Sequence, residues 1–237
     1  GVEGYAHYIH GQYKEGLACF DKADKIASEH CLEDAKFRGG IWRGICQRRA
    51  GLLSSAEATL RKLEKYPRPA GGIRFVLFNL LQAGIDFDRG RIGRAVPAIL
   101  EAHQASVECG HFSSIVLLGN VAANMAIAGD RLDAAREVLE RVRAEARGPA
   151  ENFLGAAALN EAWLAHRLGD NARRDLCLRD SLQRARDQRA RERIRWYPNA
   201  LSDLLPVALD RSIEPEVAIS LAREFRISPS APHIESW

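Results

Sequence analysis

The chain has 237 residues and a formal net charge of +3, with 46% hydrophobic and 27% charged residues. These are ordinary values for a globular protein, and the length allows either one domain or two. No apolar run reaches the roughly 18–20 residues of a membrane span, no secretory signal pattern occurs, and the charge is too small to indicate nucleic-acid binding by itself.

The first distinctive stretch, GQYKEGLACFDKA at residues 11–23, opens a pattern that occurs five times. Each copy begins with a glycine, and successive glycines are 40, 39, 39 and 40 residues apart. These glycines are Gly11, Gly51, Gly90, Gly129 and Gly169. In the first four copies a small residue follows, and a large one comes four positions after it. The small residues are Gly16, Ala56, Ala95 and Ala135, and the large ones are Phe20, Leu60, Ile99 and Leu139.

Each copy predicts a helical hairpin. The segments before the glycines, such as 113–128 and 152–168, are apolar nearly all round, as in a helix that is covered on both sides. The segments after the glycines, such as 132–147, are amphipathic. Glycine suits the corner because a chain reversal often needs a positive φ. With loops expected at 67–69 and 147–150 and no strand-like alternation, the sequence predicts an all-α fold of stacked hairpins.

The spacing G-x-Y-x-x-A-x-x-x-F-x-x-A resembles the tetratricopeptide repeat (TPR), with Gly16 in the usual alanine position. Tetratricopeptide units have 34 residues, whereas these have 39 or 40. The longer units resemble those in the sensor region of large ATP-dependent bacterial transcription regulators of the maltose-regulator (LuxR) type. The resemblance implies a right-handed α-α superhelix of about five hairpins over residues 1–188, closed by capping helices over 189–228.

The last part of the chain carries a more specific resemblance to the same regulators and to relatives with a bacterial transcriptional-activator domain. Trp196, Tyr197 and Pro198 fit the aromatic–proline helix start of that group. The middle and the exit are matched by Leu204, Leu205, Ala208, Leu209, Ile213, Glu214, Val217, Ile227, Pro229, Glu235 and Trp237. Arg211 and Ser212 stand where the group commonly has a glycine. We expect Pro215 in the first turn of a last helix.

The resemblance also implies that the chain is a fragment of a longer protein. Residues 229–237 would be a linker toward a separate output domain that contacts DNA, and an ATPase module would lie upstream. The sequence itself has no phosphate-binding loop, no GxSxG, no HExxH and no calcium loop. His7 and His10 lie one turn apart without a third ligand nearby, and the five cysteines lack zinc spacing. We therefore expect no metal, no cofactor and no enzymatic activity, in a cytoplasmic protein.

Polar residues in the apolar first helices are the candidate ligand contacts. Asn120 and Asn124 lie four apart, Asn160 lies 40 residues after Asn120, and Asn79 has a similar place in its hairpin. Buried amides need hydrogen-bond partners, so one interpretation is that they bind one another or the backbone. The other is that they line a concave groove that takes an inducer, a partner protein or neighbouring domains. Further residues expected at this groove are Trp163, Arg167, Arg38 and Arg48.

The segment 173–196 carries nine arginines and four acidic residues. Such a stripe could meet phosphate groups, which would give salt-dependent binding. Its acids are interleaved at helix spacings, however, which favours a solvated or inter-domain face. The sequence thus predicts a non-catalytic sensor or interaction domain of a transcription regulator, or alternatively a general TPR scaffold without a regulator attached.

Overall fold

The computed structural model describes residues 2–69, 72–110, 112–187, 191, 194 and 197–228, and every regular element in these ranges is a helix. The chain divides into two compact units, Gly1–His111 and Phe112–Trp237. The expectation of an all-α fold is therefore confirmed. The expected linker at 229–237 lies outside the described residues, and so do Trp196, Pro229, Glu235 and Trp237.

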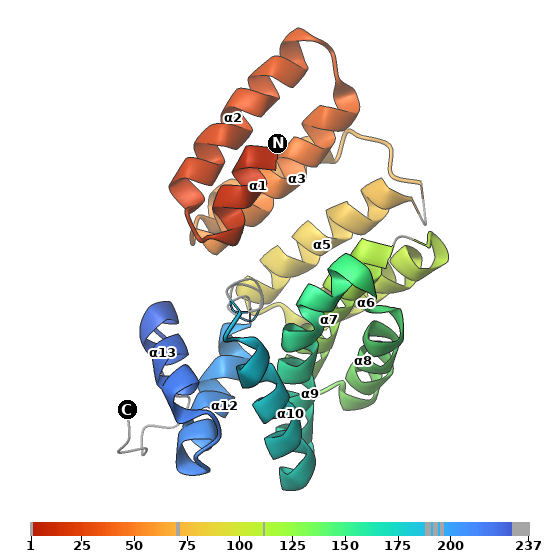
Figure 1. The fold of residues 1–237 in the computed structure, drawn as a ribbon. Helices are drawn as coiled ribbons and strands as arrows, with labels where there is room; N and C mark the ends of the chain where they lie inside the picture. The colour runs from red at the N-terminus through yellow and green to blue at the C-terminus, as the bar shows by residue number, and fades with distance from the viewer. Residues whose placement is uncertain are drawn as a thin grey trace. The chain divides into compact units, whose positions relative to one another are not determined.

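The first unit consists of three helical hairpins (Figure 1). Its helices are α1 (Val2–Ile9), α2 (Tyr13–Glu29), α3 (Glu33–Arg49), α4 (Leu53–Leu63), α5 (Ile73–Asp88) and α6 (Ile92–Glu108). Each helix contacts the next one in the chain, and α3 also contacts α5, which is the first helix of the following hairpin. The small residues predicted for the second helices are buried: Ala56 and Ala95 are 0% exposed.

The second unit repeats this arrangement and ends in two further helices. Its elements are α7 (Phe112–Ala128), α8 (Leu132–Glu145), the 3-10 helix η1 (Gly148–Phe153), α9 (Leu154–Leu168), α10 (Asn171–Arg184), α12 (Pro198–Asp210) and α13 (Pro215–Phe225). The first helices are again neighbours, because α9 contacts both α7 and α12. The prediction that Pro215 begins a last helix is confirmed. The loop expected at 147–150 instead contains the start of η1.

The hairpin corners share one hydrogen-bond pattern. A residue two or three positions beyond each first helix donates its N–H to the carbonyl five positions earlier, as Leu52 does to Gln47 at 2.9 Å. The residue directly before this donor takes a left-handed conformation. A helix end of this kind favours glycine. Gly11, Gly51, Gly90 and Gly169 hold this position, with φ from 71° to 77°. In the fourth corner the prediction is wrong by one residue, because Asp130, with φ 58°, takes the left-handed position instead of Gly129.

Candidate functional site

The three buried asparagines of unit 2 bind one another. The Asn160 amide nitrogen donates to the Asn120 carbonyl oxygen at 3.0 Å, and the Asn124 amide donates to Asn160 Oδ1 at 3.0 Å. Asn120 donates to the Val116 carbonyl at 2.9 Å within its own helix. Asn120 and Asn160 are 0% exposed and Asn124 is 7% exposed. The arrangement is the one expected of structural amides, and a ligand contact by these residues stays a prediction.

Trp163 and Arg167 lie on α9 and join it to its two neighbours. Trp163 is 3% exposed, and its indole N–H donates to Asp203 Oδ2 of α12 at 2.7 Å. Arg167 donates to the Ile127 carbonyl at 3.1 Å and to Asp130 Oδ1 at 3.1 Å, at the corner after α7. Both side chains therefore connect hairpins, and nothing in these contacts identifies a ligand.

The predicted residues of unit 1 lie in two separate environments. Arg48 is buried on α3, where its Nε is 3.1 Å from Asp88 Oδ2 of α5. Burial lowers the pKa of Arg48, and the Asp88 carboxylate works against that change. Gly84 makes room for this guanidinium, since a Cβ there would lie 1.5 Å from Arg48 Nη1. Arg38 is exposed and pairs with Asp34 at 2.8 Å, and Asn79 is half-buried on α5.

Several contacts between first helices join residues that are 40 positions apart. This separation equals the longer of the two glycine spacings in the sequence. The pairs are Arg74–Asp34 and Arg48–Asp88 between α5 and α3, Asn160–Asn120 between α9 and α7, and Trp163–Asp203 between α9 and α12. Equivalent positions of neighbouring hairpins therefore meet in both units.

An open cleft of about 830 Å³ lies between α8, α9 and α10. We call it the unit-2 cleft. It has an apolar component, which includes Leu168 and Leu176 with 48% and 63% of their surface exposed. Charged side chains of both signs complete its lining, among them Arg136, Arg173 and Asp180. None of the asparagines predicted for the groove lines it.

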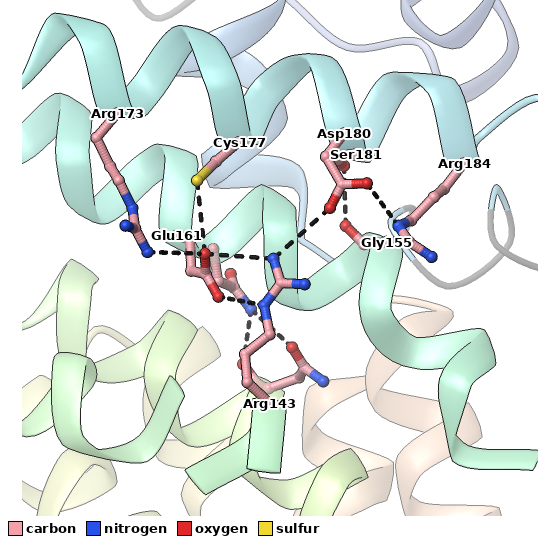
Figure 2. A network of polar contacts seen from close by, with 10 residues as sticks. Arg143, Gly155, Glu161, Arg173, Cys177, Asp180, Ser181 and Arg184 are labelled. Atoms are coloured by element: carbon pink, nitrogen blue, oxygen red, sulfur yellow. Dashed lines mark hydrogen bonds and ion pairs between the residues drawn. The ribbon is translucent and has the colours of Figure 1, made fainter. Parts of the chain in front are cut away.

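One residue that lines this cleft is a buried carboxylate, which joins several polar side chains in a network (Figure 2). Glu161 of α9 is 9% exposed, and its Oε1 accepts from Arg143 Nε of α8 at 2.6 Å. Arg173 and Cys177 of α10 each approach Glu161 Oε2 to 3.5 Å, and Arg143 also lies 3.6 Å from Asp180. The hydrogen bond to Glu161 raises the pKa of Arg143. One ion-pair network thus ties three helices together at the cleft.

The thiol in this network is kept protonated. Burial raises the pKa of Cys177 to about 11, and the Glu161 carboxylate adds to the increase. A thiol with such a pKa carries almost no thiolate at neutral pH, so it is a poor nucleophile and a poor metal ligand there. Among the residues that the structure describes, no group of three His, Cys, Asp or Glu side chains is placed to hold a metal ion.

The described arginines of the 173–196 segment are largely paired. Arg174 lies 2.6 Å from Asp175, Arg184 lies 2.8 Å from Asp180, and Arg191 lies 3.1 Å from Glu224 of α13. The Arg174–Asp175 and Arg184–Asp180 pairs fit the interpretation of interleaved acids, but Arg174 is only 6% exposed and so does not belong to a solvated face. Residues 188–190, 192, 193, 195 and 196 lie outside the described part of the chain.

Glu161, Arg143 and Cys177 are not among the site residues predicted from the sequence. One signal was available, because Glu161 is the single acidic residue in the largely apolar segment 152–168. Its partner Arg143 lies 18 residues away across a corner, and such a pairing cannot be identified from spacing within one helix.

No family model, no curated protein and no solved structure matches the chain. No described helix combines the length and the apolar character that crossing a membrane requires.

Proposed function

We propose that this chain is a non-catalytic sensor and interaction domain of a cytoplasmic bacterial transcription regulator. The observation that supports it best is the set of contacts between residues 40 positions apart, as expected for a stack of equal hairpins. We infer from this a TPR-like right-handed superhelix, in which the last helices act as a cap. The regulator itself is suggested by the residue pattern of the tail, from Tyr197 to Ile227.

The unit-2 cleft is the proposed binding site. Its exposed leucines, Leu168 and Leu176, offer apolar surface to a partner, and the surrounding charges of both signs offer orientation. This combination suits an amphipathic helical segment, either of a partner protein or of a neighbouring domain, or an inducer of mixed polarity. Binding would activate the regulator only if the ligand prefers one of its conformations. DNA contact belongs to a separate domain.

The chemistry of the cleft supports binding rather than catalysis. Glu161 is engaged by Arg143 and is therefore a poor general base. Cys177, with a pKa of about 11, is not activated as a nucleophile. Activity of the isolated domain on any substrate that depends on these two groups would contradict the proposal.

The alternative is a general protein scaffold with the same repeats and no regulator attached. A helix-turn-helix or winged-helix pattern encoded directly after residue 237 would favour the regulator. Specific operator binding by the present 237 residues alone would refute the proposed separation of sensing from DNA contact.

The direct test is thermal unfolding with a panel of sugars, amino acids and short amphipathic peptides. A ligand at 100 times its Kd stabilises the folded state by roughly 2.7 kcal/mol, which raises the melting temperature by about 5–10 °C. We expect Leu176→Ser to abolish the shift. Ile219→Ser is the matched control, because Ile219 is an exposed apolar residue of α13 that does not line the cleft. The absence of a shift with every compound would count against a small-molecule sensor.

A further inference from the structure

A second cleft, of about 450 Å³, lies in unit 1 and is lined by residues of α2, α3, α4 and the turn that follows α4. We call it the basic cleft because of its charge. Its cationic side chains are Lys36, Arg43, Arg61, Lys62 and Lys65. Asp24 is the one acidic residue among its lining residues in the described chain. A concave surface lined by charges of one sign focuses the electrostatic potential and raises the local concentration of the opposite charge.

Not all of these cations are engaged by carboxylates. Lys36 binds Glu33 at 3.0 Å and Arg43 lies 3.2 Å from Asp21, whereas the Lys65 ammonium lies over the Tyr66 ring, 5.1 Å from its centroid. Arg61 and Lys62 are both exposed, and the structure gives them no ion pair with any described residue. Two neighbouring cations of α4 are therefore available to a ligand.

Two glycines of α3 line this cleft. Gly40 is required by close packing, because a Cβ there would lie 2.7 Å from Leu63 Cδ2. Gly39 differs from it, since a Cβ at Gly39 would meet no atom within 4 Å. The absence of a side chain at Gly39 is therefore not required by packing, and the space beside it is open. Ser28 and Tyr66 add hydroxyl groups to the same lining.

We propose that the basic cleft binds a small polyanion, namely a phosphate ester or a pyrophosphate group, with Arg61 and Lys62 as its direct ligands. An arginine can donate two parallel hydrogen bonds to phosphate oxygens, and a lysine adds a point charge. The volume lies within the range of small-molecule sites. A long nucleic acid fits less well, because Asp21 and Glu33 carboxylates lie beside the cleft and would repel a continuing strand.

This site is independent of the regulator proposal, since it lies in unit 1 and shares no lining residue with the unit-2 cleft. Failure of one proposal therefore leaves the other unaffected.

The test is calorimetric titration of the chain with sodium tripolyphosphate at low ionic strength. We expect saturable binding that weakens as salt is added, because exposed charges are screened. Replacing both Arg61→Gln and Lys62→Gln removes two charge-assisted hydrogen bonds, and we expect roughly a tenfold or greater loss of affinity. Lys14→Gln is the matched control: it removes an exposed lysine of α2 that does not line the cleft, and affinity should change by less than about twofold. Circular dichroism establishes that each variant is folded.

Two further titrants distinguish the sources of the phosphate. Tighter binding of ATP than of tripolyphosphate would indicate a nucleotide, and tighter binding of ribose 5-phosphate would indicate a sugar phosphate. The proposal is overturned if tripolyphosphate gives no heat at about millimolar concentration, which is the weak end of specific binding. It is also overturned if Lys14→Gln weakens binding as much as the double variant. Binding of a single-stranded oligonucleotide that tripolyphosphate does not displace would refute it in favour of nucleic acid.

Discussion

The bonds among the buried asparagines predict an energetic coupling between α7 and α9. Replacing Asn160→Ala removes the bond to the Asn120 carbonyl and the acceptor for the Asn124 amide. Each neutral hydrogen bond contributes about 0.5–1.5 kcal/mol, and an unsatisfied buried amide costs about 1–3 kcal/mol. We therefore expect the free energy of unfolding to fall by about 2–4 kcal/mol, since part of the lost bonding is recovered by local relaxation.

A double-mutant cycle measured by urea denaturation tests this coupling. Once Asn160 is replaced, the Asn124 amide has already lost its partner, so Asn124→Ala should cost less in that background. We expect the double variant to be more stable than the sum of the single effects implies, by about 1–2 kcal/mol. Asn79→Ala is the matched control, because Asn79 lies in unit 1 and its effect should add to that of Asn160→Ala within about 0.5 kcal/mol.

Strict additivity of Asn124→Ala and Asn160→Ala would refute the reasoning, because the two amides would then not bind each other in solution. The interpretation that they are available to a ligand would gain support. In that case a ligand-induced melting shift that is lost in Asn124→Ala but retained in Leu176→Ser would place the ligand at the asparagines rather than in the unit-2 cleft.

Three further predictions concern the packing of α3, a hairpin corner and the buried thiol. Gly84→Ala should lower the free energy of unfolding by about 2 kcal/mol or more, measured by calorimetry, because the new Cβ would displace Arg48. Gly39→Ala on α3 should instead raise it by about 0.5–1 kcal/mol, because a Cβ there meets no atom within 4 Å. Equal effects of the two variants would contradict the contact between Gly84 and Arg48. Ser212→Gly should raise the melting temperature, since Ser212 has φ 52°, and a stabilisation of about 0.5–1 kcal/mol is expected; a lowered melting temperature would show that this corner is not left-handed. Because burial raises the pKa of Cys177 to about 11 from an ordinary value of 9.0, its contribution to stability is complete below about pH 9 and is lost as the pH rises through 11. Urea denaturation of wild type and Cys177→Ala from pH 8 to 11 should show that the free energy of unfolding declines more steeply in the wild type. Identical declines would exclude a raised pKa of Cys177.

Much of the local structure could be predicted from the sequence, because it depends on short-range patterns. The hairpin corners follow from glycines with no steric barrier to positive φ, and the start of α13 follows from Pro215. The fourth corner shows the limit of this reasoning. Gly129 and Asp130 are adjacent, both tolerate a left-handed conformation, and the choice between them depends on how far α7 continues.

The candidate site was less accessible to sequence reasoning. The asparagines were found because amides are rare in apolar helices, but their partners lie on another helix. The unit-2 cleft was not predicted, since one of its ion pairs joins Glu161 to Arg143 across a corner and its walls come from three helices. Similarly, the cations of α3 and α4 look unremarkable one helix at a time, and only the packing of these helices gathers them into one cleft.

The contacts between first helices suggest why the repeat length varies so little. The corner residues that follow α3 and α5, Gly51 and Gly90, are 39 residues apart, whereas the paired residues Arg48 and Asp88 are 40 apart. Between α7 and α9 the corners at Asp130 and Gly169 are also 39 apart, and Asn120 and Asn160 are again 40 apart. The same one-residue offset in both units means that α3 and α5 are related in the same way as α7 and α9. One residue inserted within a first helix would turn its later side chains by about 100° and misalign these pairs. Insertions should therefore be tolerated in the corners between hairpins and not in the first helices.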